Sequence, residues 1–202
     1  MNKWLERYLD KYGGVTGNVT QGEREMNKVR IGESVTLNEA EQEICRAVGM
    51  AKSFNSRSAG VENQRIGPQD DQLTDLNGFG GEFAFCKIFN VFPDFSMELR
   101  NAATDRGDAL LPSGHTVDVK TTVYPAGKLI AAPSLKDNHD LYALMTGTFP
   151  EYTLRGFIST EMLHDDLYKR PMGDRTTYWA YQSELCQWWE CVFGPDDPIP
   201  SY

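Results

Sequence analysis

The chemistry and the fold of this chain centre on one segment, Gly107-Asp108-Ala109-Leu110-Leu111-Pro112-Ser113-Gly114-His115-Thr116-Val117-Asp118-Val119-Lys120. Both of its arms have the composition of β-strands, and the Pro-Ser-Gly between them is typical of a turn. The segment therefore predicts a β-hairpin. Alternate side chains of a strand share a face, so Asp118 and Lys120 are expected to point to the same side of the second arm.

The register of this hairpin determines which charged residues face each other. If Ser113 is the centre of the turn, Asp108 lies opposite Asp118, because each is five residues away from it. Directly opposed residues have Cβ atoms about 4.5–5.5 Å apart, where like charges repel. A divalent cation bound by oxygen ligands would offset that repulsion. The hairpin therefore predicts a metal site.

Length and charge limit the classes of protein to consider. The chain has 202 residues, which suit one domain or one domain with an extension, and its formal net charge is −9. Residues 137–202 hold 4 Lys and Arg against 11 Asp and Glu, whereas residues 1–136 hold 16 against 18. The acidity argues against non-specific attraction to nucleic acid, but a local groove can still be positive.

The chain has no apolar run long enough to cross a membrane, and its charged N-terminus lacks the apolar stretch of a signal peptide. We therefore expect a cytoplasmic protein. Its four cysteines show no Cys-x-x-Cys spacing and are expected to be free thiols in a reducing compartment: Cys45, Cys86, Cys186 and Cys191.

Periodicity and turn residues predict helices on either side of a group of strands. One helix is expected over residues 4–12, and a second from about residue 40, after a capping box at Thr36–Glu39. A third is expected over residues 78–90, beginning at the glycines of that segment, and a fourth from Thr160. A long connection is expected over Asn55–Asn77. Strands are expected at 141–148 and 152–159, in addition to the hairpin. This order favours an α/β fold with a mixed sheet flanked by helices.

At this point the chain resembles a known family. Glu82 on a helix, followed by Asp108 and then by Asp118-x-Lys120 on the next strand, resembles the PD-(D/E)XK nuclease superfamily. The Gly-x-x-Gly-Glu-x-Ala form of Gly78–Ala84 is similar to phage-encoded members. The resemblance covers roughly residues 78–160 and departs from the pattern at Gly107, where the eponymous proline is absent.

The resemblance implies a restriction-endonuclease-like α/β core over residues 78–202 with an acidic C-terminal segment, preceded by an N-terminal helical extension over 1–77. It implies a metal-dependent deoxyribonuclease, an endonuclease encoded by a phage and acting in the host cytoplasm. Cutting both strands of a duplex would favour a homodimer. No phosphate-binding loop motif is present in the sequence, so no nucleotide cofactor is expected, and no membrane partner is expected.

The resemblance also implies a role for each site residue. Asp108, Asp118 and the Val119 backbone carbonyl would hold Mg²⁺, for which Mn²⁺ would substitute. Glu82 would bind through water or hold a second ion. Lys120 would orient the attacking water and stabilise the charge of the transition state.

Other readings of the same residues stay open. The chain could be a catalytically silent protein that retains the nuclease fold, or an acidic interaction protein that binds a host DNA-binding partner. Asp105 competes with Asp108 for the metal. Basic residues near the core could contact phosphates: Arg57, Arg65, Arg100, Arg106, Lys128 and Arg155. The aromatic residues around Trp179 and Tyr181 could stack bases or pack in the core, and His115 is expected at the surface.

Overall fold

The computed structural model describes residues 29–58, 71–96, 107–132 and 138–193. The helix predicted over residues 4–12 lies outside them. The main sheet has five strands in the order β1-β6-β5-β3-β2. These strands are β1 (Ser34–Thr36), β2 (Ala109–Leu110), β3 (Thr116–Thr122), β5 (Leu141–Thr148) and β6 (Glu151–Ser159). β3 and β5 run parallel and the other neighbours antiparallel, which confirms a mixed sheet in an α/β fold.

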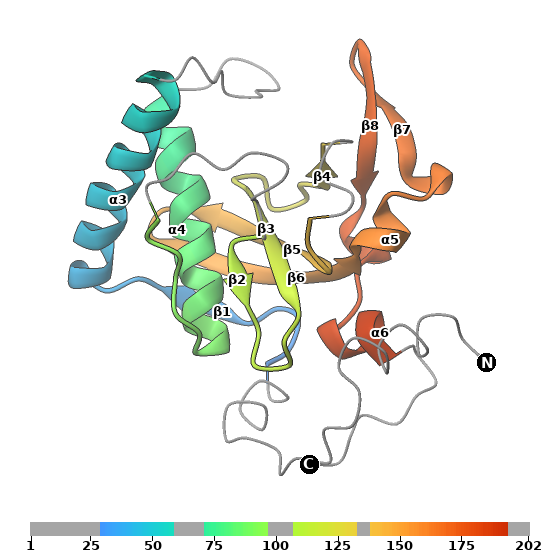
Figure 1. The fold of residues 1–202 in the computed structure, drawn as a ribbon, viewed down its shortest axis with the longest axis horizontal. Coiled ribbons are helices and arrows are strands. Elements are labelled where there is room, and N and C mark those ends of the chain that lie inside the picture. The colour runs from blue at the N-terminus through green and yellow to red at the C-terminus, as the bar shows by residue number, and fades with distance from the viewer. Residues whose placement is uncertain (1–28, 59–70, 97–106, 133–137, 194–202) are drawn as a thin grey trace.

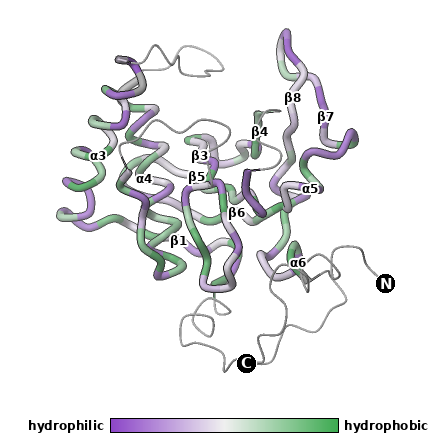
Figure 2. Tube along the Cα trace, viewed as in Figure 1, coloured by the Kyte–Doolittle hydropathy of each residue, from purple (hydrophilic) through white to green (hydrophobic). Residues whose placement is uncertain are grey.

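A second, smaller sheet follows the main one. Its strands lie in the order β4-β8-β7, with β4 at Leu129–Ala131, β7 at Lys169–Met172 and β8 at Arg175–Ala180. The β7–β8 hairpin projects away from the main sheet (Figure 1), and β7 itself is largely hydrophilic (Figure 2). Four short helices complete the C-terminal half: α5 (Thr160–Leu163), α6 (Trp188–Phe193) and the 3₁₀-helices η2 (Asp166–Tyr168) and η3 (Gln182–Glu184).

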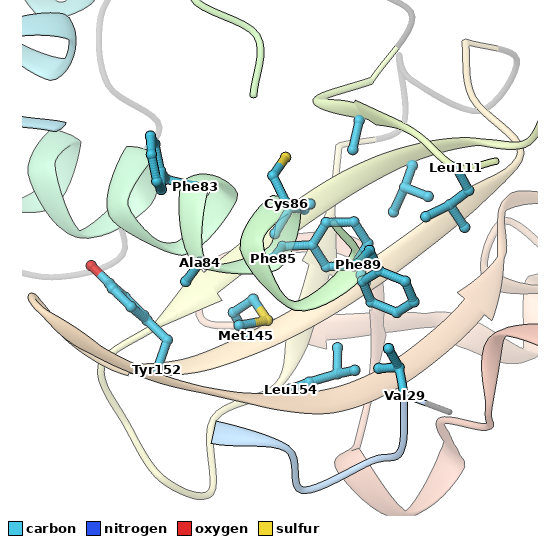
Figure 3. Close-up of a cluster of buried hydrophobic side chains, with 14 of the residues drawn as sticks. Val29, Phe83, Ala84, Phe85, Cys86, Phe89, Leu111, Met145, Tyr152 and Leu154 are labelled. Atoms are coloured by element: carbon cyan, nitrogen blue, oxygen red, sulfur yellow. The ribbon is translucent and has the colours of Figure 1, made fainter. Parts of the chain in front are cut away.

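Two long helices form layers on one side of the main sheet. α4 (Asp71–Phe89) packs against the sheet, and α3 (Glu39–Ser58) packs against α4 (Figure 1). The apolar residues of α4 interlock with those of β5 and β6 in the larger core, where Phe85 and Phe89 lie above Met145 and Leu154 (Figure 3). The opposite face of the sheet forms a smaller core with β4 and β8, around Tyr142 and Leu144.

The hairpin predicted around Ser113 is confirmed. Ala109 pairs with Val117 and Leu110 pairs with Thr116, so the two arms are symmetric about Ser113. The surface position expected for His115 is wrong, because its side chain is buried. The His115 Nδ1 atom lies 3.0 Å from the Ser113 hydroxyl, so the turn itself supplies a polar partner for the ring.

The starts of both long helices differ from expectation. Thr36 pairs with Glu151 in the sheet, and the capping box lies two residues later. There the Asn38 side chain accepts from the Glu41 amide, and the Glu41 carboxylate accepts from the Asn38 amide. The connection predicted over 55–77 is wrong at both ends, because α3 continues to Ser58 and α4 already begins at Asp71. The boundary predicted at residue 78 falls inside α4.

Two glycines inside α4 allow the helix to lie close to the sheet. A Cβ atom on Gly81 would overlap the Thr121 side chain of β3, and one on Gly80 would overlap the Tyr152 hydroxyl of β6. The glycines predicted as a helix start are therefore points of contact with the sheet. Gly78, one turn earlier, has no neighbour within 4 Å of a Cβ position.

Alanine at these glycines should change stability in opposite directions. Gly78→Ala is expected to raise the free energy of unfolding by up to about 1 kcal/mol, because alanine favours the helix and meets nothing. Gly81→Ala is expected to lower it by about 1–3 kcal/mol, because the new methyl overlaps Thr121. Urea denaturation of both variants measures the difference. Equal stabilisation by the two changes would contradict the close approach of α4 to β3.

The prediction of four free thiols is wrong for two of them. Cys186 and Cys191 form a disulfide, because the turn into α6 brings the two side chains together. Cys45 and Cys86 are free and buried. Among the described residues, no helix is long and apolar enough to span a membrane.

Candidate functional site

Asp118 and Lys120 form the centre of the candidate site. Val117 and Val119 of β3 enter the larger core beneath α4, so the alternating Asp118 and Lys120 side chains point to the other face of the sheet. Asp118 is only 5% exposed, and the Lys120 Nζ atom lies 2.5 Å from its Oδ2 atom. The buried carboxylate is therefore paired with a lysine whose side chain is 30% exposed.

Asp108 joins them from the other arm of the hairpin. Its Oδ2 atom accepts a hydrogen bond of 2.8 Å from the Val119 amide. The residue before it, Gly107, has φ +82°, and a Cβ atom there would lie 2.6 Å from the Val117 carbonyl oxygen. Only glycine fits this conformation at such close approach, which gives a physical reason for Gly107 at the position where the resembled family carries proline.

The Val119 carbonyl lies on the same side of β3 as Asp108. The N–H and C=O groups of one strand residue point toward the same neighbouring strand, and the Val119 N–H points to Asp108. β2 begins only at Ala109, which pairs with Val117, so this carbonyl faces the place where the strand pairing stops. Two carboxylates and one backbone carbonyl, which are potential metal ligands, thus lie at the same end of the hairpin.

Glu82 reaches the area from α4 and has a different partner. Its Oε2 atom lies 3.6 Å from the Nζ atom of Lys52 on α3. The two residues line one end of a cavity of about 230 Å³ between α3 and α4, together with Ser53 and Phe79. Glu82 therefore faces the surface between the two helices.

Two ionisable groups show that these charges act on one another. Burial lowers the pKa of Lys120, but the negative charges of Asp118, Asp108 and Glu82 outweigh it, so the pKa is raised above 10.5. Burial raises the pKa of the Cys86 thiol to about 12, and the charges of Glu82 and Asp108 contribute to that rise. The charges of Glu82 and Asp108 thus act on both Lys120 and Cys86.

The raised pKa of Lys120 gives a pH-dependent contribution to stability. The ion pair is expected to stabilise the folded protein fully below pH 10.5, and to lose that effect as the pH rises through the higher folded-state pKa. The difference in unfolding free energy between wild type and Lys120→Met should therefore be constant at neutral pH and shift against wild type above pH 10.5. Urea denaturation at pH 8 and pH 11 measures it, and an unchanged difference would contradict the ion pair.

The residues present fit a hard cation in part. Two aspartates and a backbone carbonyl are the kind of oxygen ligands that Mg²⁺ takes, with water filling the other positions. Among the described residues, however, no group of three or more His, Cys, Asp or Glu side chains is arranged to hold a metal ion. Asp108, Asp118 and the Val119 carbonyl are therefore the candidate direct ligands, and Glu82 would contribute through water or hold a second ion.

The structure adds residues that the sequence did not single out. Lys52 neighbours Glu82 from a helix 30 positions earlier, and no local pattern marks it. The Tyr142 ring lies 6.0 Å from the Lys120 Nζ atom, and its hydroxyl lies 3.0 Å from His164 Nε2. Tyr142 belongs to a strand predicted correctly, but its pairing with Asp118 needs the register of β3 against β5.

The predicted phosphate contacts fall into two groups. Arg57 pairs with Asp75 at 3.2 Å, and Arg155 donates to the Thr146 hydroxyl, so both serve internal contacts. Lys128 lies against aromatic rings at the end of the loop after β3. The remaining candidates lie outside the described residues: Arg65, Arg100, Arg106 and the alternative ligand Asp105.

Comparison with known proteins gives one match. No curated protein and no solved structure matches the chain. A family of unknown function, DUF5843, matches residues 27–159. This region runs from before β1 to the end of β6 and includes every candidate site residue. Because the match covers more than half of its residues, the chain belongs to the family of unknown function DUF5843.

Proposed function

We propose that this protein is a Mg²⁺-dependent nuclease that hydrolyses DNA phosphodiester bonds, with Asp108, Asp118 and Lys120 at the site and Glu82 beside it. The observation that carries the proposal is the position of Lys120, whose ammonium pairs with the buried Asp118 while Asp108 accepts a hydrogen bond from the amide of Val119, the residue between those two. The resemblance to PD-(D/E)XK nucleases supports the same four residues as the active site. We also propose that the α/β fold is of the restriction-endonuclease type.

The roles follow from the contacts of each residue. Asp108 and Asp118 would hold the cation with the Val119 carbonyl, and Glu82 would contribute through water. A bound Mg²⁺ would act as a Lewis acid toward the phosphate and lower the pKa of a coordinated water. The Lys120 ammonium, released from Asp118, would donate hydrogen bonds to the attacking water and to a phosphate oxygen as negative charge develops there.

One feature favours a second candidate, a catalytically silent member of the same fold. Each of the three carboxylates has a partner within the protein: the Val119 amide for Asp108, Lys120 for Asp118 and Lys52 for Glu82. These partners stabilise the carboxylates in the absence of a cation. The same residues would therefore also suit a protein that binds DNA or metal without cutting.

A cleavage assay across metals tests the proposal. The purified protein is incubated with supercoiled plasmid, linear duplex and single-stranded DNA in Mg²⁺, Mn²⁺, Ca²⁺ or EDTA. Cleavage is expected in Mg²⁺ and Mn²⁺ and not in EDTA. Binding of Mn²⁺ or DNA by calorimetry without cleavage would favour the silent protein. Binding of neither would favour the acidic interaction protein.

A further inference from the structure

A cation and two aromatic rings, one of them exposed, meet where β3 leads into the second sheet. The Lys128 Nζ atom lies 3.7 Å from the centroid of the Trp179 ring and 4.9 Å from that of Tyr181. The two rings meet edge to face at 4.9 Å. Trp179 is buried, whereas Tyr181 is 48% exposed. We call the surface formed by Lys128 and Tyr181 the β4–β8 platform.

Lys128 gives the platform a cation in an otherwise acidic protein. Residues 119–132 contain two lysines and no acidic residue. Within the part of the chain that the structure describes, Lys128 forms no ion pair with a carboxylate, and its contacts are with the two rings. Its ammonium therefore remains available to an anionic ligand, while the rings fix its position.

The neighbouring residues hold Tyr181 rigidly. Arg170 forms two hydrogen bonds to the Glu184 carboxylate, at 2.7 and 2.9 Å, and Glu184 accepts from the Tyr181 amide. The Gln182 side chain donates to the carbonyls of Pro125 and Gly127 in the loop before Lys128. The backbone of Tyr181 and the loop before Lys128 are thus held in place before any ligand binds.

This platform lies next to the proposed active site. Thr122 shares a face of β3 with Asp118 and Lys120, four residues beyond Asp118, which is about 13 Å along the strand. Gly127 packs so closely on the Thr122 side chain that a Cβ atom would overlap it. The loop therefore carries Lys128 directly past the end of the row formed by Asp118, Lys120 and Thr122.

We infer that the β4–β8 platform binds a single-stranded segment of DNA that leads to the site, an inference that rests on the proposed nuclease function. An unpaired base would stack on the exposed face of Tyr181, and the Lys128 ammonium would pair with a backbone phosphate. Duplex DNA keeps its base faces stacked internally, so it cannot use the ring in this way. The substrate class that we infer is therefore DNA with single-stranded ends or gaps.

Binding of a fluorescein-labelled oligothymidine in Ca²⁺, measured by anisotropy, tests the inference without requiring cleavage. Tyr181→Ala is expected to weaken binding by about 5- to 100-fold, the effect of one lost base stack, while Tyr181→Phe keeps the affinity. Lys128→Met is expected to lower the slope of log affinity against log salt by about 0.7. Lys169→Met, at an exposed lysine of β7, is the matched control and should leave the slope unchanged.

The outcomes separate this inference from the proposed function. Binding that depends on Tyr181 and Lys128 without cleavage by wild type would support the platform and overturn the nuclease. Cleavage with binding that neither variant weakens would overturn the platform alone. Equal affinity for a duplex of the same length would also overturn it, and an oligouridine in place of oligothymidine distinguishes RNA from DNA. Near-ultraviolet circular dichroism of Tyr181→Phe and Tyr181→Ala checks that both fold.

Discussion

Replacing Asp118 by asparagine is expected to reduce Mg²⁺-dependent DNA cleavage by at least about 10²-fold. The change keeps the shape of the side chain but removes the charge that is proposed to bind the cation and that pairs with Lys120 at 2.5 Å. Cleavage rates with saturating Mg²⁺ measure the loss. Asp174→Asn, in the exposed turn between β7 and β8, is the matched control and should cleave like wild type.

A second variant distinguishes the proposed roles of the two residues. Lys120→Met should also abolish cleavage, but it leaves both aspartates and should therefore retain Mn²⁺ binding in calorimetry. Asp118→Asn should weaken that binding. Cleavage unaffected by either substitution, in variants whose thermal unfolding stays cooperative, would overturn the assignment of this site.

Replacing Phe85 by alanine is expected to lower the free energy of unfolding by about 3–5 kcal/mol. Phe85 is fully buried in a ring cluster, with its centroid 4.6 Å from Phe89 and 5.9 Å from Phe157. This cluster joins α4 to β6, so the change leaves a cavity between the helix that carries Glu82 and the sheet. Urea denaturation monitored by circular dichroism measures this loss of unfolding free energy.

Phe54 provides the control for this change. It is 71% exposed on α3, so Phe54→Ala removes a ring of the same size at little cost, within about 0.5 kcal/mol. Equal losses from the two substitutions would show that the Phe85 cluster does not hold α4 on the sheet.

Local signals in the sequence predicted the central part of the fold. The hairpin was predictable because Pro112, Ser113 and Gly114 have turn chemistry, and because strand alternation continues on both sides of them. β5, β6 and the start of α5 were predictable for the same reason. The first turns of α4 were not, because Asp71–Asn77 is polar and the glycines that follow resemble a helix start. Their actual role depends on contacts with Thr121 and Tyr152.

The candidate site could be predicted only as far as it is local. Asp118 and Lys120 share a strand, and Asp108 follows from the symmetry of the turn about Ser113. The Glu82–Lys52 pair needs the packing of α3 on α4, and the Lys128–Tyr181 contact needs the pairing of β4 with β8. Contacts of this kind join positions 30 to 53 residues apart, over which sequence periodicity carries no information.

The lengths of the outer strands affect how two copies of this chain could associate. β1 and β2 border the main sheet with only three and two residues, so each of these two strands by itself offers few unpaired backbone donors and acceptors. Strand addition from another molecule needs a longer free edge. A homodimer is therefore not expected to form by strand addition at β1 or β2, and an interface through side chains of helices or loops could be disrupted by surface substitutions that leave the hydrogen-bonded sheet intact.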